Sequence, residues 1–415
     1  MQRRGGVSQE ELRRLNMSAL LWRVHTSGST TRAQLTMDLG LNRSTIGDLT
    51  GQLECLGLVS EEVPSGQVLA GGRRSGRPSL VVVPRQDVTV LAVALEVDRV
   101  TVALVGLGGS VLRTRSRRHE ERRHDVARLV RTAAQLSRQL LRRSRVHCIG
   151  VGVSVCGAVR ASDGLIHFAP SLGWVDEPFT ELLGAELGLP VAADNDANLG
   201  VLAEHLRGAA VGVDDVAYVW AGGGVGLGAG LLLGGAPMRG ADGYAGEVGH
   251  LVVDSSGPRC RCGLVGCWET RVGEDVLLCA VGRPSGGGPR AVAEVVRAAD
   301  EDDRAAAAAV TDLARWIGTG LRGVVNAFNP RLVVLGGLLR SVWLARSPQV
   351  LAALDPPSLV GAHAALQLRP SALGDQAHLL GAAELAFAPL LGDPLRVGAA
   401  IRAETVPLSV GASTA

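Results

Sequence analysis

The chain has 415 residues, of which 47% are hydrophobic and only 3% aromatic, so we expect two or three domains with cores of Val, Leu and Ala. No apolar stretch is long enough to cross a membrane, and no apolar run follows the N-terminal arginines, so the sequence predicts neither a membrane span nor a signal peptide. The formal net charge is only +2, yet residues 1–85 carry eleven Arg against seven acidic residues, which is +4, and the remainder is therefore about −2.

A basic N-terminal segment on a nearly neutral body is a mild indication of contact with nucleic acid. All 42 basic residues are arginine, which codon bias in a GC-rich genome explains more simply than a functional need. Seven cysteines, three of them in one cluster, fit the reducing cytoplasm better than an oxidising compartment. We therefore expect a cytoplasmic protein.

The N-terminal segment has the pattern of three short helices. Apolar residues recur with a rough helical period over 9–26. Thr31, with Gln34 three residues later, is a capping box that opens a second helix, which Gly40 ends. Asn42 caps a third helix, whose apolar face consists of Ile46, Leu49, Leu53 and Leu56.

Two short helices joined around a glycine form a helix-turn-helix, in which the first residues of the second helix meet base edges in the major groove. The residues at that position are Arg43, Ser44 and Thr45. Arginine can bind guanine through two hydrogen bonds, and Ser or Thr can reach a base or a phosphate. The alternative is an ordinary three-helix unit in which Arg43 is merely solvated.

Two apolar runs, at 58–60 and 80–83, predict strands on either side of a basic loop, which together make a wing. Three arginines of this loop lie among glycines and a proline, namely Arg73, Arg74 and Arg77. Extended arginines of this kind fit a narrow minor groove, although a flexible basic linker is equally compatible with the loop alone. Together the helices and the wing predict a DNA-binding domain over residues 1–85.

The next part of the chain alternates strands and helices. We expect antiparallel strands at 88–96, 99–107 and 110–114, followed by a charged bend at 115–124. After the bend we expect an amphipathic helix at 125–143, a buried strand at 148–155 and another helix at 179–187. An apolar strand from Leu189 then leads into the polar segment 194–198, which precedes a helix. Carboxylates and amides at such a place can bind and orient a ligand hydroxyl, but they are also ordinary helix caps.

The remainder repeats this scheme. We expect strands at 215–220, 231–233 and 331–335. We also expect a flexible connection at 283–290, a long helix at 305–328 and a last apolar helix at 378–391. The glycines of 222–230 permit either the approach of a phosphate or simply a tight hairpin. Residues after about 396 show no pattern and are expected to be disordered.

One histidine and three cysteines crowd a single segment, namely His250, Cys260, Cys262 and Cys267. The spacing H-x9-C-x-C-x4-C supplies one imidazole and three thiolates, which complete a tetrahedral zinc shell without a position for water, so the metal would be structural. It would tie the cysteine loop to the end of a strand that carries His250. Unrelated buried cysteines and a disulfide are the alternatives, but Cys-x-Cys is a poor disulfide spacing.

Six segments together resemble the ROK family of repressors and sugar kinases, and specifically its repressor branch. They are GGRRSGRPSL at 71–80, DNDAN at 194–198, GGGVGLGAG at 222–230, AGEVGH at 245–250, CRCGLVGCWE at 260–269 and FNPRLVVLGG at 328–337. The resemblance implies an α/β fold in which a winged helix-turn-helix precedes a two-lobed, actin-like sugar-kinase domain over 86–395. The small lobe would comprise about 86–193 with the helix 378–391, and the large lobe about 194–375.

The resemblance also implies a zinc ion on the four residues of the cysteine loop. It implies a sugar site formed by Asn195, Asp196, Glu247, His250 and Glu269, in which Asp196 matches the catalytic base of the kinases. His250 would then serve both sites, with one ring nitrogen on zinc and the other toward the sugar.

Two departures from the family pattern matter. ROK kinases begin their first hairpin with a D-x-G-G-T phosphate-binding turn, where this chain reads Ala94-Leu95-Glu96-Val97-Asp98. The acid that organises magnesium is replaced by Ala94, and Glu96 would repel a triphosphate, so we expect no use of ATP or magnesium beyond residual catalysis through Asp196. The other departure is Cys156, where the family usually has proline, beside the sugar site.

These features predict a sugar-responsive transcription factor, with repression favoured and activation left open. A dimer, or a dimer of dimers, would bind a palindromic double-stranded operator. A sugar or sugar phosphate in the cleft would change lobe closure and so the spacing of the DNA modules, with the zinc loop as the relay. The alternative is an active ATP-dependent sugar kinase with an accessory DNA-binding domain, which Asp196 favours and Ala94, Glu96 and Val97 oppose.

Overall fold

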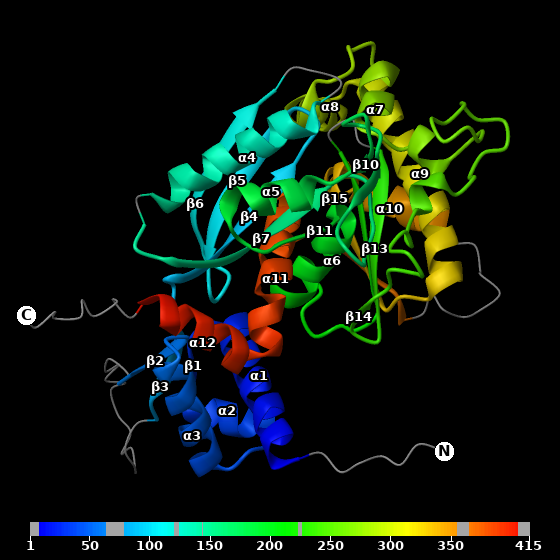
Figure 1. The fold of residues 1–415 in the computed structure, drawn as a ribbon. Coiled ribbons are helices and arrows are strands. Elements are labelled where there is room, and N and C mark those ends of the chain that lie inside the picture. Colours follow the sequence, from blue (N-terminus) through cyan, green and yellow to red (C-terminus); the bar gives the residue numbers. More distant parts are fainter. Residues whose placement is uncertain are drawn as a thin grey trace, which may run out of the picture.

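The computed structural model describes residues 8–63, 79–119, 124–142, 144–222, 226–354 and 365–405. A small helical module at the N-terminus lies below a larger body, in which two sheets stand beside each other with helices between and around them (Figure 1). Among the described residues, no helix is both long enough and apolar enough to cross a membrane.

The N-terminal module is a winged helix. Its elements are α1 Gln9–Ser27, β1 Thr30–Thr31, α2 Arg32–Leu39, α3 Arg43–Cys55, β2 Val59–Glu62 and β3 Val81–Pro84. The predicted caps are present, because the Thr31 and Asn42 side chains accept hydrogen bonds from the backbone N–H groups of Gln34 and Thr45. The strands pair antiparallel in the order β1-β3-β2. The loop with Arg73, Arg74 and Arg77 lies outside the described residues.

The buried face of α1 differs from the expected one. Its core residues are Met17, Leu20, Leu21 and Val24, whereas Leu12, Leu15 and Trp22, which belong to the predicted apolar pattern, are between 40% and 58% exposed. The segment carries apolar residues on two faces, and only one of them packs against the rest of the module. The periodicity therefore identifies the helix but not its orientation.

The first sheet of the body has the strand order β11-β7-β4-β5-β6. Its strands are β4 Val88–Leu95, β5 Arg99–Gly106, β6 Val111–Arg118, β7 His147–Val155 and β11 Val191–Asn195. Strands β4, β5 and β6 are antiparallel neighbours, whereas β7 and β11 run parallel to β4 and to each other. Every residue of β4 is buried, as expected for a central strand with helices on both faces.

Three helices cover this sheet, namely α4 Val126–Leu141, α5 Phe179–Leu187 and α11 Ala377–Gly392. Helix α11 comes from the far end of the sequence and approaches β7 so closely that a Cβ at Gly152 would lie 1.8 Å from the Ala382 carbonyl oxygen. The bend predicted over 115–124 is wrong at its start, since β6 continues to Arg118 as an exposed edge strand. The predicted lobe boundary at 193/194 falls inside β11, which stays in this sheet through Asn195.

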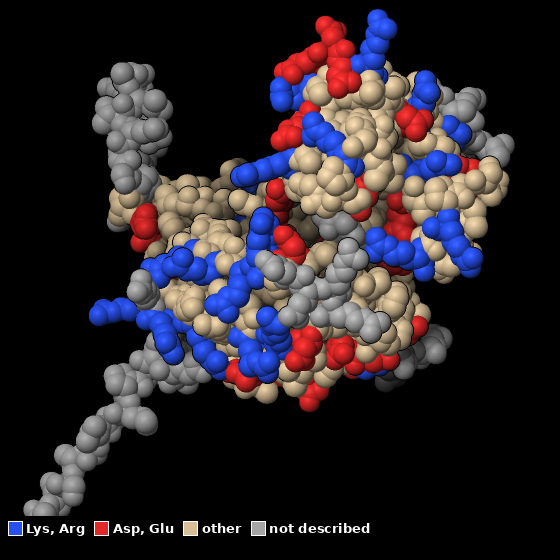
Figure 2. Space-filling view, turned by 90° about the horizontal axis from the view of Figure 1, so that it is seen from above, with Lys and Arg blue, Asp and Glu red and all other residues tan. Residues whose placement is uncertain are grey.

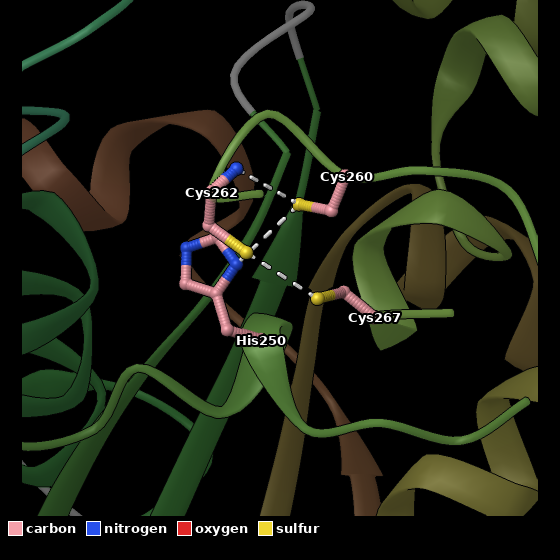
Figure 3. A group of neighbouring side chains, drawn as sticks. All are labelled: His250, Cys260, Cys262 and Cys267. Carbon is pink, nitrogen blue, oxygen red and sulfur yellow. Dashed lines mark hydrogen bonds between the residues drawn. The ribbon is translucent and has the colours of Figure 1, made fainter. Parts of the chain in front are cut away.

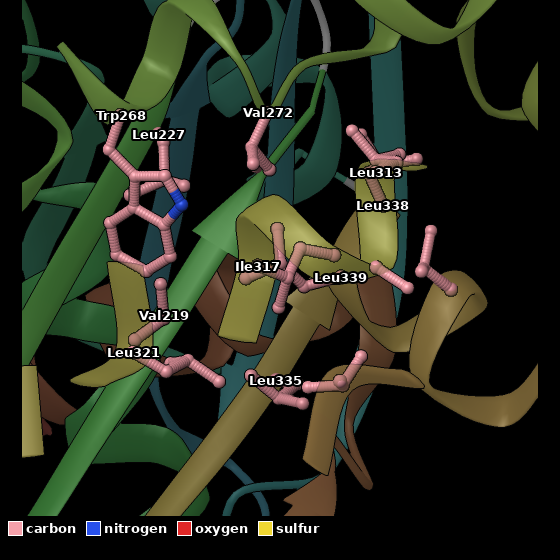
Figure 4. Close-up of a cluster of buried hydrophobic side chains, with 14 of the residues drawn as sticks. Val219, Leu227, Trp268, Val272, Leu313, Ile317, Leu321, Leu335, Leu338 and Leu339 are labelled. Atoms are coloured by element: carbon pink, nitrogen blue, oxygen red, sulfur yellow. The ribbon is translucent and has the colours of Figure 1, made fainter. Parts of the chain in front are cut away.

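The second sheet has the order β14-β13-β12-β15-β16. Its strands are β12 Val216–Ala221, β13 Leu227–Leu233, β14 Ala236–Pro237, β15 Leu332–Gly337 and β16 Gln367–Pro370. One face packs on α6 Asp196–Arg207, and the other faces a large core formed with α7 Glu274–Ala280, α8 Gly288–Asp300, α9 Arg304–Phe328 and α10 Leu338–Leu354. Figure 4 shows Trp268 in this core beside Val219, Leu227 and Leu321.

Several elements of the body were not expected. A small antiparallel sheet, β8 Ala158–Val159, β9 Ile166–Ala169 and β10 Trp174–Glu177, follows the first parallel strand. Helix α10 and strand β16 extend the second half, and α8 begins at Gly288, inside the connection predicted to be flexible. Short 3₁₀ turns occur at η1 Val248–His250, η2 Trp268–Thr270 and η4 Gly374–Gln376.

The disordered tail predicted from 396 is wrong as far as Thr405, because the chain forms a last helix, α12 Pro394–Thr405. Proline suits the first position of a helix, and Leu395 and Val397 pack against the core shared by α11 and the winged helix. Gly398 faces Leu56 of the N-terminal module, since a Cβ there would lie 3.3 Å from that side chain. The C-terminal helices thus join the body to the N-terminal module.

Candidate functional site

The predicted metal ligands lie together. The ligand atoms of His250, Cys260, Cys262 and Cys267 are all within 4.8 Å of one another, and the side chains point toward a common centre (Figure 3). The Cys262 and Cys267 sulfurs are 3.5 Å apart, and the Cys260 sulfur is 3.7 Å from His250 Nδ1. Tetrahedral zinc with bonds of about 2.3 Å to sulfur separates its ligands by roughly 3.7 Å, so these residues fit zinc.

The surroundings also favour a cation. The Cys260 thiol donates a hydrogen bond to Glu269 Oε1 at 2.8 Å, and the same oxygen is 3.6 Å from His250 Nδ1. Thiolates this close to a carboxylate would repel it, and a divalent ion removes that repulsion. Gly263 and Gly266 have φ values of +98° and +75°, which is the conformation expected for this loop.

The position of His250 corrects one expectation. His250 lies in the 3₁₀ turn η1, not at the end of a strand. The turn reaches the sheet through Gly249, where a Cβ would lie 2.1 Å from the Leu227 carbonyl oxygen of β13. His250 Nδ1 faces the sulfurs, whereas Nε2 is 3.8 Å from Glu247 Oε2. The ring therefore has Nδ1 on the metal side, near Glu269, and Nε2 toward Glu247.

The polar segment at the start of α6 caps this helix, and its acidic side chains also lie near other acidic groups. Asn195 is the N-cap, and its side chain accepts hydrogen bonds from the backbone N–H groups of Ala197 and Asn198. Its amide also donates to the Gly157 carbonyl oxygen at 3.0 Å. Asp196 is only 7% exposed and interacts electrostatically with Glu247, across from the zinc loop. The segment is thus a capped helix N-terminus and also part of a polar site.

Several of the residues predicted to bind sugar lie within electrostatic range of one another. The charges of Asp196, Glu247 and Glu269 act on the Cys156 thiol, and that of Glu247 acts on Asp196. Burial raises the pKa of the Cys156 thiol above its ordinary value. Seen from above, the surface is hollowed between the two halves of the body, with acidic side chains at the rim (Figure 2).

Two partners of this site were missed by sequence reasoning. Asp194 accepts hydrogen bonds from Asn198 Nδ2 at 3.0 Å and from Arg239 at 2.6 and 2.9 Å. This ion pair ties the loop after β14 to the start of α6, and Asp194 is only 6% exposed. Forty-five residues separate Asp194 from Arg239, so no local pattern signals the contact.

The protonation of Asp196 should be visible in protein stability. Burial raises its pKa from 3.8 to about 7. The folded state then binds the proton more tightly than the unfolded chain, so stability falls as pH rises from about 4 through 7. Asp196→Asn cannot ionise and is expected to be more stable than the wild type at pH 8, by up to roughly 4 kcal/mol.

At pH 5.5 the stability advantage of Asp196→Asn should fall to roughly half. Wild-type Asp196 is then protonated in the folded state but still ionised in the unfolded chain, so only the cost of proton uptake remains. Urea unfolding of both proteins at the two pH values checks the prediction. Asp163→Asn is a suitable control, because Asp163 is an exposed acid paired with Arg160. A stability difference that did not change with pH would contradict the assignment of a buried, high-pKa carboxyl.

The turn between β4 and β5 has an acidic character. Glu96 Oε2 accepts a hydrogen bond from Thr101 at 3.1 Å, and Arg99 lies 3.3 Å from Asp98 and 3.8 Å from Glu96. Burial raises the pKa of Glu96, and the neighbouring charges of Asp98 and Asp375 raise it further. The turn thus holds two acidic side chains, Glu96 and Asp98, against the single arginine Arg99.

The residues predicted to contact DNA stand at the free end of α3. Arg43 and Ser44 are exposed, and Thr45 is half-buried. The Ser44 hydroxyl donates to the Asn42 side chain at 2.7 Å, which fixes it at the start of the helix. The helix is anchored from behind by Ile46, Leu49 and Leu53, so its first turn faces outward.

Comparison with known proteins gives the same assignment. The sequence profile of the ROK family matches residues 90–388, which is most of the chain. The chain belongs to the ROK family. The family and the α/β fold class expected from the sequence are thereby confirmed.

Within the family, similarity to regulators extends further along the chain. The xylose repressor of Caldicellulosiruptor bescii is 27% identical over 400 residues, covering 92% of this chain and 98% of that protein. The structure of a ROK family transcriptional regulator, a homologue of the E. coli MLC protein, has a TM-score of 0.75 and 25% identity, and the match covers 93% of this chain and 99% of that one. A glucokinase of Streptomyces coelicolor is 31% identical, but over only 60% of this chain and 82% of the kinase.

Proposed function

We propose that this ROK protein is a sugar-responsive repressor of genes of carbohydrate metabolism. The observation that carries the proposal is that regulators match the winged helix and the body together, over 92–93% of the chain, whereas the glucokinase matches 60%. These regulators thus match nearly the whole chain, and the glucokinase a smaller part of it. The winged helix at the N-terminus gives this ROK body a means of contact with DNA.

The DNA contact is assigned to the start of α3. Arg43 would bind base edges in the major groove, with Ser44 and Thr45 on bases or phosphates. The loop arginines Arg73, Arg74 and Arg77 would reach the minor groove or the phosphates beside it. A homodimer, or a dimer of dimers, would place two such helices on a palindromic operator.

The effector is assigned to the site between the lobes. Asp196, Glu247 and Glu269 supply carboxylates that accept hydrogen bonds from sugar hydroxyls, and Asn195 and His250 complete the set. Zinc has a structural role here, because four protein ligands leave no position for a substrate. With Nδ1 on the metal, His250 is held so that Nε2 faces the sugar. Cys156 narrows the same site and contributes to the choice of sugar.

We further infer that the chain is not a kinase. The turn that would receive ATP phosphates has Ala94 in place of the magnesium-organising acid, and Glu96 and Asp98 add negative charge there. A coupled assay for ADP release over hexoses and pentoses is expected to show no turnover. Turnover abolished by Asp196→Asn would instead support an active sugar kinase with an accessory DNA-binding domain.

The proposal is tested by DNA binding measured against a panel of sugars. A labelled fragment from upstream of the gene is titrated with the protein at fixed salt, since phosphate contacts make affinity depend strongly on salt. Xylose, glucose, N-acetylglucosamine and their phosphates are added in turn. One of them is expected to weaken DNA binding by 5- to 150-fold, on the order of known allosteric couplings. DNA affinity that no sugar changes would contradict the proposal.

A further inference from the structure

One cluster of ionisable side chains lies buried where the DNA module meets the body. It consists of His25 at the end of α1, Arg207 at the end of α6, and Glu384 in the middle of α11. The side chains of His25 and Glu384 are 0% and 2% exposed, and that of Arg207 is 12% exposed. Glu and Arg are almost never buried to this degree unless they are paired.

The cluster joins three separate parts of the molecule. Glu384 Oε2 is 2.8 Å from His25 Nε2, while Glu384 Oε1 accepts a hydrogen bond from Arg207 Nε at 2.6 Å. Although burial favours the neutral form, His25 and Arg207 hold the pKa of Glu384 below its ordinary value, so this carboxylate is ionised. The ring of His25 also packs on Phe387, with the centroids 5.0 Å apart.

The β5–β6 turn closes the cluster from the other side. Gly108 donates its backbone N–H to His25 Nδ1 at 3.0 Å, and its carbonyl oxygen accepts from Arg207 at 2.9 Å. A Cβ at Gly109 would lie 2.2 Å from the guanidinium carbon of Arg207, so only glycine leaves room for this side chain. Arg207 is therefore held by the small-lobe sheet, by α11 and by the DNA module.

The helix that carries Arg207 begins in the effector site. Asp196 is the first residue of α6 and Arg207 the last, so about 18 Å of helix connects them. Nearly every residue of α6 is buried or half-buried, and the helix packs on the large-lobe sheet through Ala197 and Val201. A helix enclosed in this way moves as a unit, and a shift at Asp196 is carried to Arg207.

Helix α11 belongs to the opposite lobe. It packs on the small-lobe sheet and crosses α6 closely, since a Cβ at Gly381 would lie 2.0 Å from the Leu199 carbonyl oxygen. The Arg207–Glu384 ion pair therefore spans the two lobes, and His25 adds the DNA module to it. A change in lobe closure that moves α6 against α11 alters this pair and the position of His25 together.

We infer that the His25–Arg207–Glu384 cluster is the coupling element through which occupation of the effector site changes the DNA module. This inference rests on the proposed function. It assigns the transmission of the sugar signal to helix α6, whereas the sequence predicted the zinc loop as the relay. The zinc loop packs on β13 and α9, with Trp268 donating a hydrogen bond to the Trp316 carbonyl oxygen, and thus lies within the large lobe. The cluster binds neither sugar nor DNA, so its residues are positioning residues.

The test compares Glu384→Gln and Arg207→Met with wild type in three measurements: sugar affinity by calorimetry, operator affinity by anisotropy, and the ratio of operator Kd values with and without saturating sugar. Both variants are expected to keep their sugar and operator affinities within about 3-fold of the wild type. The ratio of operator Kd values with and without sugar is expected to fall from at least about 5-fold in the wild type to below about 2-fold in the variants. The matched control is Arg369→Met, because Arg369 binds the Ala209 carbonyl oxygen just beyond α6 but not the DNA module.

The outcomes distinguish a failure of the proposed function from a failure of the coupling role alone. A wild-type protein whose DNA binding ignores every sugar would overturn the proposed function itself. A responsive wild type with variants that respond equally would overturn the coupling role alone, as would an Arg369→Met variant that loses the response to the same degree. Should either single variant fail to fold, the double variant Arg207→Met/Glu384→Gln, which leaves no unpaired charge in the junction, is measured instead, and a retained ratio there would also overturn the inference.

Discussion

Replacing Cys267 with serine is expected to give a chain that holds no zinc and unfolds at a much lower temperature. Cys267 is fully buried and immediately precedes Trp268, whose ring lies in the core against α9. A metal bound by the four residues would link this anchored cysteine to His250 and to the loop that carries Cys260 and Cys262. Metal affinity of this kind is folding free energy, and zinc at a thousand times its Kd adds about 4 kcal/mol to stability.

The measurement is the zinc content per chain together with thermal unfolding in the presence and absence of a chelator. Cys279→Ser is the matched control, because Cys279 is an exposed cysteine outside the cluster. It is expected to retain one zinc ion per chain and the wild-type unfolding temperature. A Cys267→Ser protein with bound zinc and unchanged stability would show that the four residues do not form the metal site.

Asp196→Asn is expected to abolish the sugar response while leaving DNA binding intact. The carboxyl group is buried within electrostatic range of Glu247 and the Cys156 thiol, and the proposed function assigns it a hydrogen bond from a sugar hydroxyl. Loss of a hydrogen bond to a charged group costs about 1.5–3 kcal/mol, which corresponds to roughly 10- to 150-fold weaker sugar binding. The winged helix does not contain this residue, so operator affinity without sugar should match that of the wild type.

Calorimetric titration with the effector sugar and anisotropy with the operator check the two halves of this prediction. Because the same variant is expected to be more stable than the wild type at pH 8, unfolding would not account for a lost response. Asp163→Asn again serves as the control. Sugar affinity that Asp196→Asn leaves unchanged would place the effector elsewhere in the molecule.

Features with short-range causes were predictable from the sequence. The caps at Thr31 and Asn42 and the glycine after α2 mark the ends of helices, and each of the two cap hydrogen bonds connects residues only three positions apart. The metal site was predictable for the same reason, since its three cysteines lie within eight residues and their chemistry is specific. The segment around Asn195 and Asp196 was predictable as a capped helix start, and Asn195 is the N-cap of α6. Its interpretation as a sugar site stays a prediction.

Long-range packing was not predictable in this way. Helix α12 has a weak apolar pattern, and Leu395 and Val397 are partly buried only because the core shared by α11 and the winged helix lies opposite them. The two apolar faces of α1 left its orientation undecided, because the partner that buries Leu20 and Val24 is set by the tertiary fold. The buried cluster is the clearest example, since His25 and Glu384 are separated by 359 positions.

The central claim is that one molecule links a sugar site at Asp196 to an operator site at Arg43. Linkage requires reciprocity: if the sugar weakens operator binding by some factor, the operator must weaken sugar binding by the same factor. The most direct measurement is therefore the sugar Kd of the free protein and of the protein saturated with operator DNA, at one salt concentration. The account predicts that the operator raises the sugar Kd by the factor found in the reverse titration. Equal sugar Kd values in the two states would contradict it.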